Sequence, residues 1–172
     1  MMLFMLPESS ISSITFGATA AALNSGEVDW WQQVPTDLIP VLAKNKDVKV
    51  ESVDPLGSIG LLRFNHLQPP FNNVKLRQAV LAVVNQNDYA IAIAGDAKNG
   101  KPCASFFTCG TPMANTAGSE ALTGKRDIER AKQLVKESGY KGEKVILMSA
   151  TDQPIVHSQA LVTQDILKKI GL

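Results

Sequence analysis

Residues 62–81 constrain the fold of this chain most, because three kinds of structure follow one another there. An extended apolar run ends at Asn65, and a Pro-Pro pair at positions 69 and 70 then interrupts regular structure. Asn72 or Asn73 is placed to cap a helix that opens Val-Lys-Leu-Arg-Gln-Ala-Val. The stretch therefore predicts an extended segment, a break and a capped helix.

The predicted helix carries one continuous apolar stripe. Its apolar side chains recur at the spacing that places them on a single helix face. They are Leu76, Ala79, Val80, Val83 and Val84. We expect this stripe to be buried against a sheet.

Helical and extended patterns alternate along the rest of the chain, which predicts the α/β class. Periodicity and composition predict helices over residues 18–23, 36–44, 88–94, 127–138 and 154–170, with Asn87 and Asp152 as caps. They predict extended segments or strands over residues 28–31, 48–53, 60–65 and 144–149. The run Val-Ile-Leu-Met in the last segment is unbroken, so we expect that strand to be buried on both faces.

The charge balance excludes two classes of main partner. The chain has 172 residues, with 17 basic against 16 acidic side chains, and its Lys and Arg are scattered. Nucleic acid and anionic membrane surfaces usually demand a basic surface, so neither is expected as a partner. No apolar run approaches the ~20 residues of a membrane span.

Cys103 and Cys109 lie six residues apart in a segment rich in Gly, Pro, Ser and Thr. In an oxidising compartment this spacing permits a local disulfide, and free thiols are the alternative. A metal or redox site is not expected, because neither histidine lies at a ligand spacing and no Cys-x-x-Cys occurs. We expect no cofactor.

Catalysis has little support in the sequence. The phosphate-binding, dinucleotide-binding, nucleophile-elbow and zinc-protease motifs are all absent. His157 is expected to be a surface or capping residue, and His66 follows a strand end without a carboxylate nearby in sequence. We therefore expect that the chain is not an enzyme. The alternative is a small α/β enzyme that uses His66 or Cys109.

Three segments together resemble a known family. Residues 71–88 contain Phe-Asn-Asn-Val-Lys-Leu-Arg-Gln-Ala and then Asn-Gln-Asn-Asp. Residues 23–31 contain Gly-Glu-x-Asp, and residues 131–140 read Ala-Lys-x-Leu-x-x-Glu-x-Gly-Tyr. From about residue 20 to residue 172, this order resembles the family 5 extracytoplasmic solute-binding proteins, which are dipeptide and oligopeptide receptors of ABC importers.

The resemblance implies a fold and a division of the chain. The expected fold is periplasmic-binding-protein-like, of the class II or cluster C type, with a mixed sheet and flanking helices. Full receptors of the family are much longer and have two lobes around a cleft, so the chain is expected to be a fragment. Residues 1–55 would be the end of the first lobe and the hinge crossover, and residues 56–172 the second lobe, incomplete at its C-terminal end.

The resemblance also implies two ligand-binding segments. The segment after Gly-Glu-x-Asp faces the ligand in the family, which suggests Trp31 and Gln32, although both tryptophans could instead be packed. The hinge segment passes along the cleft, and its small residues would let a peptide main chain pair with it as an added strand. Its candidate residues are Leu56, Ser58, Ile59 and Gly60, and the alternative is a mere crossover.

The function implied by the resemblance is capture of a peptide-like solute outside the membrane and its delivery to the ABC permease subunits. The protein would meet the membrane only through the transporter. Its place would be periplasmic or otherwise extracytoplasmic, although residues 1–8 lack the cationic region of a secretory signal. A non-transport interaction module on the same scaffold is the other alternative.

Overall fold

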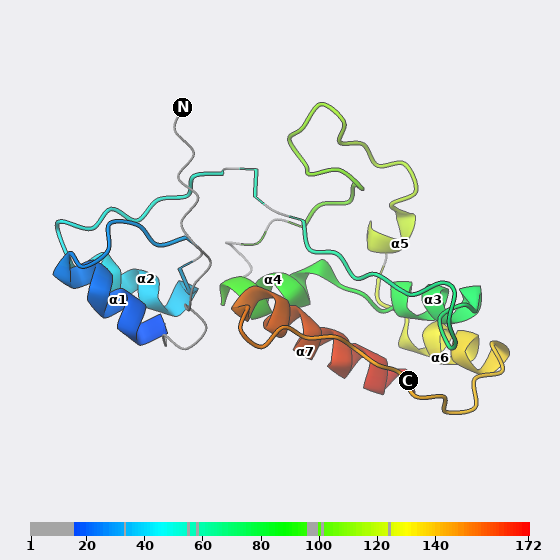
Figure 1. Cartoon of the computed structure of the whole chain (residues 1–172). Coiled ribbons are helices and arrows are strands. Elements are labelled where there is room, and N and C mark those ends of the chain that lie inside the picture. Colours follow the sequence, from blue (N-terminus) through cyan, green and yellow to red (C-terminus); the bar gives the residue numbers. More distant parts are fainter. Residues whose placement is uncertain are drawn as a thin grey trace. The chain divides into compact units, whose positions relative to one another are not determined.

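The computed structural model describes residues 16–32, 34–54, 56–57, 59–95, 100, 102–123 and 125–172 (Figure 1). The chain divides into two compact units, residues 1–52 and residues 53–172. The assignment of residues 1–55 and 56–172 to two lobes stays a prediction.

The described residues of the N-terminal unit form three short helical elements, which are α1 (Phe16–Ser25), η1 (Thr36–Leu38) and α2 (Ile39–Leu42). Ala20 and Leu42 are its buried apolar side chains among the described residues. The Asn45 amide donates to the Asn24 side chain over 3.1 Å, which links the end of α1 to the turn after α2. The predicted helices over residues 18–23 and 36–44 are therefore present with slightly different bounds.

The C-terminal unit is built from two helix pairs. Its helices are α3 (Val74–Leu81), α4 (Gln86–Ala94), α5 (Glu120–Thr123), α6 (Ile128–Glu137) and α7 (Pro154–Lys169). Helix α3 packs against α6, and α4 packs against α7 (Figure 1). The short helix α5 lies outside every helix and strand that the sequence predicts.

The predicted apolar stripe forms one side of the core of this unit. Four of its five members are buried, with Leu76, Val80 and Val83 each at most 2% exposed. The surface that covers them differs from the prediction, because helices α6 and α7 supply it in place of a sheet. The core residues from these helices and the adjoining turn are Ala131, Leu134, Val135, Ile166, Leu167 and Ile170.

Helix starts follow the predicted capping chemistry with two corrections. Asn73 caps α3 by accepting a hydrogen bond from the Lys75 amide over 2.9 Å, as predicted. Helix α4 is capped by Asn85, because its start lies two residues before the predicted one and Asn87 is already inside it. Asp152 does not cap α7, whose first flanking residue is Gln153 and which starts with Pro154.

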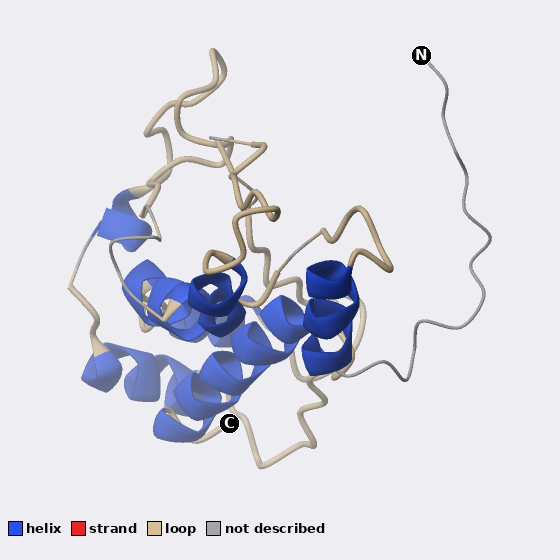
Figure 2. Cartoon of the chain, turned by 90° about the vertical axis from the view of Figure 1, so that its left-hand side faces the viewer, coloured by secondary structure: helices blue, strands red, loops and turns tan. Residues whose placement is uncertain are grey.

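The described residues contain no β-strand, and Figure 2 shows helices joined by loops. Residues 48–53, 60–65 and 144–149 run without helix or ladder pairing among the described residues. The predicted burial of residues 144–149 on both faces is wrong, because Ile146 is 76% exposed and Met148 is 89% exposed. A strand exists only when another strand completes its hydrogen bonds, and none of the described residues does so here.

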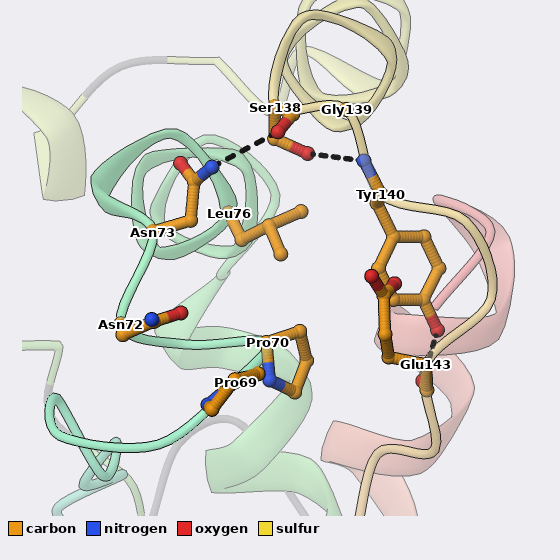
Figure 3. Close-up of a pocket in the computed structure, with 9 residues that line it drawn as sticks. All are labelled: Pro69, Pro70, Asn72, Asn73, Leu76, Ser138, Gly139, Tyr140 and Glu143. Atoms are coloured by element: carbon orange, nitrogen blue, oxygen red, sulfur yellow. Dashed lines mark hydrogen bonds between the residues drawn. The ribbon is translucent and has the colours of Figure 1, made fainter.

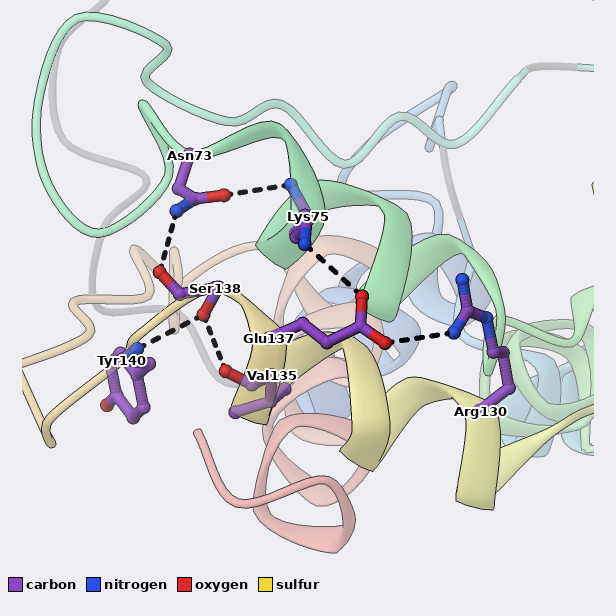
Figure 4. Close-up of polar contacts among 7 residues, drawn as sticks. All are labelled: Asn73, Lys75, Arg130, Val135, Glu137, Ser138 and Tyr140. Carbon is purple, nitrogen blue, oxygen red and sulfur yellow. Dashed lines mark hydrogen bonds and ion pairs between the residues drawn. The ribbon is translucent and has the colours of Figure 1, made fainter.

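A polar bracket joins the start of α3 to the end of α6 (Figure 4). The Asn73 amide nitrogen donates to the Ser138 carbonyl over 3.0 Å, while its oxygen caps α3. Lys75 and Arg130 each contact the Glu137 carboxylate, over 3.3 and 3.4 Å. The two helices are therefore tied together at one end by both amide and ionic contacts.

We expect the stability of this bracket to depend on pH through Glu137. The hydrogen bond from Lys75, helped by Arg130, lowers the pKa of Glu137 below its ordinary value of 4.5. Its stabilising effect is therefore complete above the unfolded-state pKa and is lost as the pH falls through the lower folded-state pKa. Urea unfolding at pH values from about 6 down to about 3 should show a smaller acid-induced loss in Glu137→Gln than in the wild type.

Glu129→Gln is the matched control, because Glu129 lies on the same helix with its side chain 85% exposed. It should follow the wild-type dependence on pH. A Glu137→Gln profile that is indistinguishable from both would show that the bracket does not stabilise the fold.

Candidate functional site

The hinge segment that was predicted to line the cleft contains residues 56–60, which we call the crossover segment. It is exposed at every position that the structure describes. Asp54 shapes its start, since its carboxylate accepts hydrogen bonds from the amides of Leu56 over 2.9 Å and Gly57 over 3.3 Å. Gly57 has a φ of 73°, a left-handed conformation that favours glycine. Ser58 lies outside the described residues.

Helix α7 borders this segment at Gly60. A methyl group placed on Gly60 would lie 2.5 Å from the Gln159 side-chain nitrogen, so the Gln159 amide lies directly against the Gly60 backbone. Any side chain at position 60 would displace this flexible amide. The contact places a neutral donor and acceptor beside exposed main chain.

Two hydroxyl groups, those of Thr163 on α7 and Tyr89 on α4, form a chain of hydrogen bonds that ends at the backbone carbonyl of Gln159. The buried Thr163 hydroxyl donates to the Gln159 carbonyl over 2.8 Å, so the Tyr89 hydroxyl, 3.1 Å away, donates to Thr163. Burial raises the pKa of Tyr89 above its ordinary value of 10.0. The chain of hydrogen bonds therefore stays protonated and fixed at neutral pH.

The disulfide loop borders the same segment at Leu56. In the structure Cys103 and Cys109 form a disulfide with Cα atoms 5.8 Å apart. A methyl group placed on Gly110 would lie 2.9 Å from a Leu56 methyl carbon, so the loop and the crossover segment are in contact. Leu56 and Gly60 thus touch two different elements that are far apart in sequence.

The predicted residues Trp31 and Gln32 belong to the N-terminal unit. The Trp31 ring stacks on Phe16 with centroids 6.5 Å apart, whereas Trp30 is 70% exposed and Gln32 is exposed. The alternative in which both tryptophans are packed is therefore wrong. A ligand-binding role for Trp31 and Gln32 stays a prediction.

The residues of the enzymatic alternative are not arranged for catalysis. Cys109 has no free thiol, because it is joined to Cys103. His66 is exposed, and no hydrogen bond or ion pair of its side chain is found among the described residues. The His157 ring lies 2.9 Å from the Ser149 hydroxyl. Nucleophilic catalysis needs a nucleophile and a base within hydrogen-bond reach, with a third group to orient the base. Neither His66 nor Cys109 has such partners among the described residues.

A pocket of about 240 Å³ lies elsewhere in the C-terminal unit, between the start of α3 and the turn after α6 (Figure 3). The Tyr140 hydroxyl beside it donates to the Glu143 carbonyl over 2.7 Å. The pocket is smaller than the range of about 300–1,000 Å³ typical of ligand sites. Its lining residues are Pro69, Pro70, Asn72, Asn73, Leu76, Ser138, Gly139, Tyr140 and Glu143, and none of them was a predicted site residue.

Two other kinds of site find no support in the part of the chain that the structure describes. No group of three or more His, Cys, Asp or Glu side chains there could hold a metal ion. No helix among the same residues is long and apolar enough to cross a membrane.

Sequence reasoning missed Gln159, which borders the crossover segment, and the Thr163 and Tyr89 hydroxyls that are linked to its backbone. Each is ordinary for its helix, and nothing in local sequence marks it. The contacts join positions about 70 to 100 residues apart, so only the packing of α7 beside α4 brings them together.

Comparisons with known proteins agree with the order of segments along the chain. Residues 10–172 match the family model of bacterial extracellular solute-binding proteins, family 5. The chain is 36% identical over 154 residues to a probable peptide ABC transporter periplasmic-binding protein of Sinorhizobium fredii. It is 27% identical over 155 residues to a glutathione-binding protein of Salmonella choleraesuis.

These alignments cover 90% and 89% of this chain but only 29% of the length of each relative. The chain therefore spans less than a third of the curated relatives that it matches. The family model nevertheless covers nearly all of its residues. The chain belongs to the bacterial extracellular solute-binding proteins of family 5.

Proposed function

We propose that this chain forms one wall of a binding site for a peptide-like solute in a substrate-binding receptor of an ABC importer. The observation that carries the proposal is the exposure of the described positions 56, 57, 59 and 60, which lie between Gln159 of α7 and the disulfide loop. Asp54 already binds the amides of Leu56 and Gly57, so the main chain of a peptide would pair as an added strand with the other backbone groups of the segment, around Gly60. The Gln159 amide is placed to bind a further peptide group.

The names of the relatives support this solute class, since one is described as peptide-binding and the other as glutathione-binding. Both solutes would present amide groups to such a wall. The receptor would work outside the cytoplasmic membrane and pass its solute to permease subunits. Ligand would favour a closed state through contacts that exist only when both walls surround it.

The proposal includes the mixed sheet of a periplasmic-binding-protein-like fold. Residues 60–65 and 144–149 lie outside the helices, and none of their backbone groups forms a backbone–backbone hydrogen bond within the described part of the chain. Ile146 and Met148 are exposed apolar side chains of the kind that a completed sheet and its covering layer would bury. In the longer receptor, strands from other parts of the chain would complete the ladder.

Backbone-amide NMR of the chain tests the proposed site, because it detects weak binding. Peptides at millimolar concentration should shift the signals of residues 56–60 and of the Gln159 side chain. Calorimetry at micromolar concentration should show no saturable heat, since one wall leaves a ligand mostly hydrated whereas complete pockets bury about 70–90% of it.

Gly60→Ala should raise the peptide Kd roughly tenfold, which corresponds to about 1.4 kcal/mol. The methyl group would displace the end of the flexible Gln159 side chain, so the fold is kept while the approach to the main chain is blocked. Gly17→Ala is the control, because a methyl group there meets nothing within 4 Å. Peptide-induced shifts confined to other residues, or a Gly60→Ala variant that binds as well as the control, would refute the proposed site.

A further inference from the structure

The loop closed by the disulfide is braced at three places. The Cys103–Cys109 bond closes it. Gln86, the first residue of α4, binds both the amide and the carbonyl group of Cys103 through its side chain. Its oxygen accepts from the Cys103 amide over 2.6 Å, and its nitrogen donates to the Cys103 carbonyl over 2.8 Å. The Ser105 hydroxyl oxygen accepts from the amides of Phe107 and Asn115, over 3.2 and 3.1 Å. The loop therefore holds its shape without a buried core of its own.

This braced loop exposes large apolar side chains. Phe106 is 80% exposed and packs only edge-on against Phe107, with ring centroids 5.3 Å apart. Met113 is 60% exposed. An aromatic ring stabilises a fold chiefly by being buried, so Phe106 contributes little to folding in this position. A rigid, exposed aromatic ring loses little conformational entropy when a ligand covers it.

The loop is continuous with the proposed solute site. Gly110 lies directly after the disulfide and contacts Leu56, which begins the crossover segment. Residues 102–113 contain no Asp, Glu, Lys or Arg, so the loop has no charged side chain to pair with a charged group of a ligand. Its chemistry suits an uncharged apolar or aromatic side chain.

We propose that the disulfide loop selects the side chain of the solute, with Phe106 as the residue that contacts an apolar or aromatic side chain of a peptide bound along residues 56–60. This inference rests on the proposed function. The loop would give the site a preference for certain peptide side chains, whereas the crossover segment itself would contact only the main chain of the peptide.

Amide NMR titrations of the 172-residue chain with trialanine, Ala-Phe-Ala, Ala-Asp-Ala and Ala-Lys-Ala test the inference. All four should shift residues 56–60, but only Ala-Phe-Ala should also shift the signals of residues 103–113. Phe106→Ser should raise the Kd of Ala-Phe-Ala about five- to tenfold and change that of trialanine less than about twofold. Met148→Ser is the matched control, because Met148 is 89% exposed and lies outside the loop.

A Cys103→Ser, Cys109→Ser double variant supplies a second test through the bracing of the loop. It should lose the preference for Ala-Phe-Ala while it still binds trialanine. Folding of each variant is checked by helical circular dichroism.

The outcomes separate the two proposals. Shifts at residues 56–60 with no preference for Ala-Phe-Ala, or a preference that Phe106→Ser leaves intact, would overturn this inference and leave the proposed function standing. No shift at residues 56–60 with any peptide would overturn both. Loop signals that move with protein concentration in the absence of peptide would identify a second copy of the chain as the occupant, and the inference would be wrong.

Discussion

Leu76→Ala should lower the free energy of unfolding by about 2–5 kcal/mol, the range found for leucines truncated in close-packed cores. Leu76 lies on α3 and is only 2% exposed, surrounded by core side chains from α6 and α7. The substitution removes buried apolar surface and leaves a cavity that the helix pair can fill only in part. Urea unfolding monitored by circular dichroism measures the change.

Leu81→Ala is the matched control, because Leu81 ends the same helix and is 43% exposed. It should lower the free energy of unfolding by about 1 kcal/mol or less, in proportion to the smaller area it buries. Similar losses in the two variants would mean that the stripe of α3 does not face the core.

Asn73→Ala should lower the free energy of unfolding by about 1.5–3 kcal/mol. Loss of a helix cap costs about 0.5–2 kcal/mol, and loss of the hydrogen bond to the Ser138 carbonyl adds about 1 kcal/mol. Both contacts come from the one partly buried amide group of Asn73. The same urea titration measures the effect.

Two further variants separate the contributions. Asn73→Asp keeps an oxygen for the cap but has no nitrogen to donate to Ser138, so its loss should lie between those of the wild type and Asn73→Ala. Asn72→Ala is the control, since the exposed Asn72 side chain has no hydrogen bond among the described residues. If Asn72→Ala and Asn73→Ala unfold alike, the bracket between α3 and α6 has no energetic role.

The helices of this chain could be predicted because their signals are local. The stripe around Val80 and the cap at Asn73 each depend on residues within a few positions of one another. Errors of one or two positions arose where neighbours offer the same chemistry, as with Asn85 and Asn87 at the start of α4. Neighbouring capping residues compete, and packing decides between them.

The extended segments could not be predicted in the same way. An apolar run such as residues 144–149 indicates a strand, but its burial depends on a partner strand that the run itself does not specify. The candidate site likewise has one part that the sequence could indicate and another that it could not. The crossover segment was proposed from the family resemblance, whereas its contacts with Gln159 and the disulfide loop depend on the packing of distant elements.

The exposed segment at residues 144–149 has a consequence for the behaviour of the chain in solution. In this segment Ile146 and Met148 are exposed, whereas Val145 and Leu147 are partly buried. Its backbone has no ladder partner among the described residues. Such an edge can recruit an extended segment of another molecule and start aggregation. Lys144, which precedes the run, is a charged residue of the kind that opposes this association.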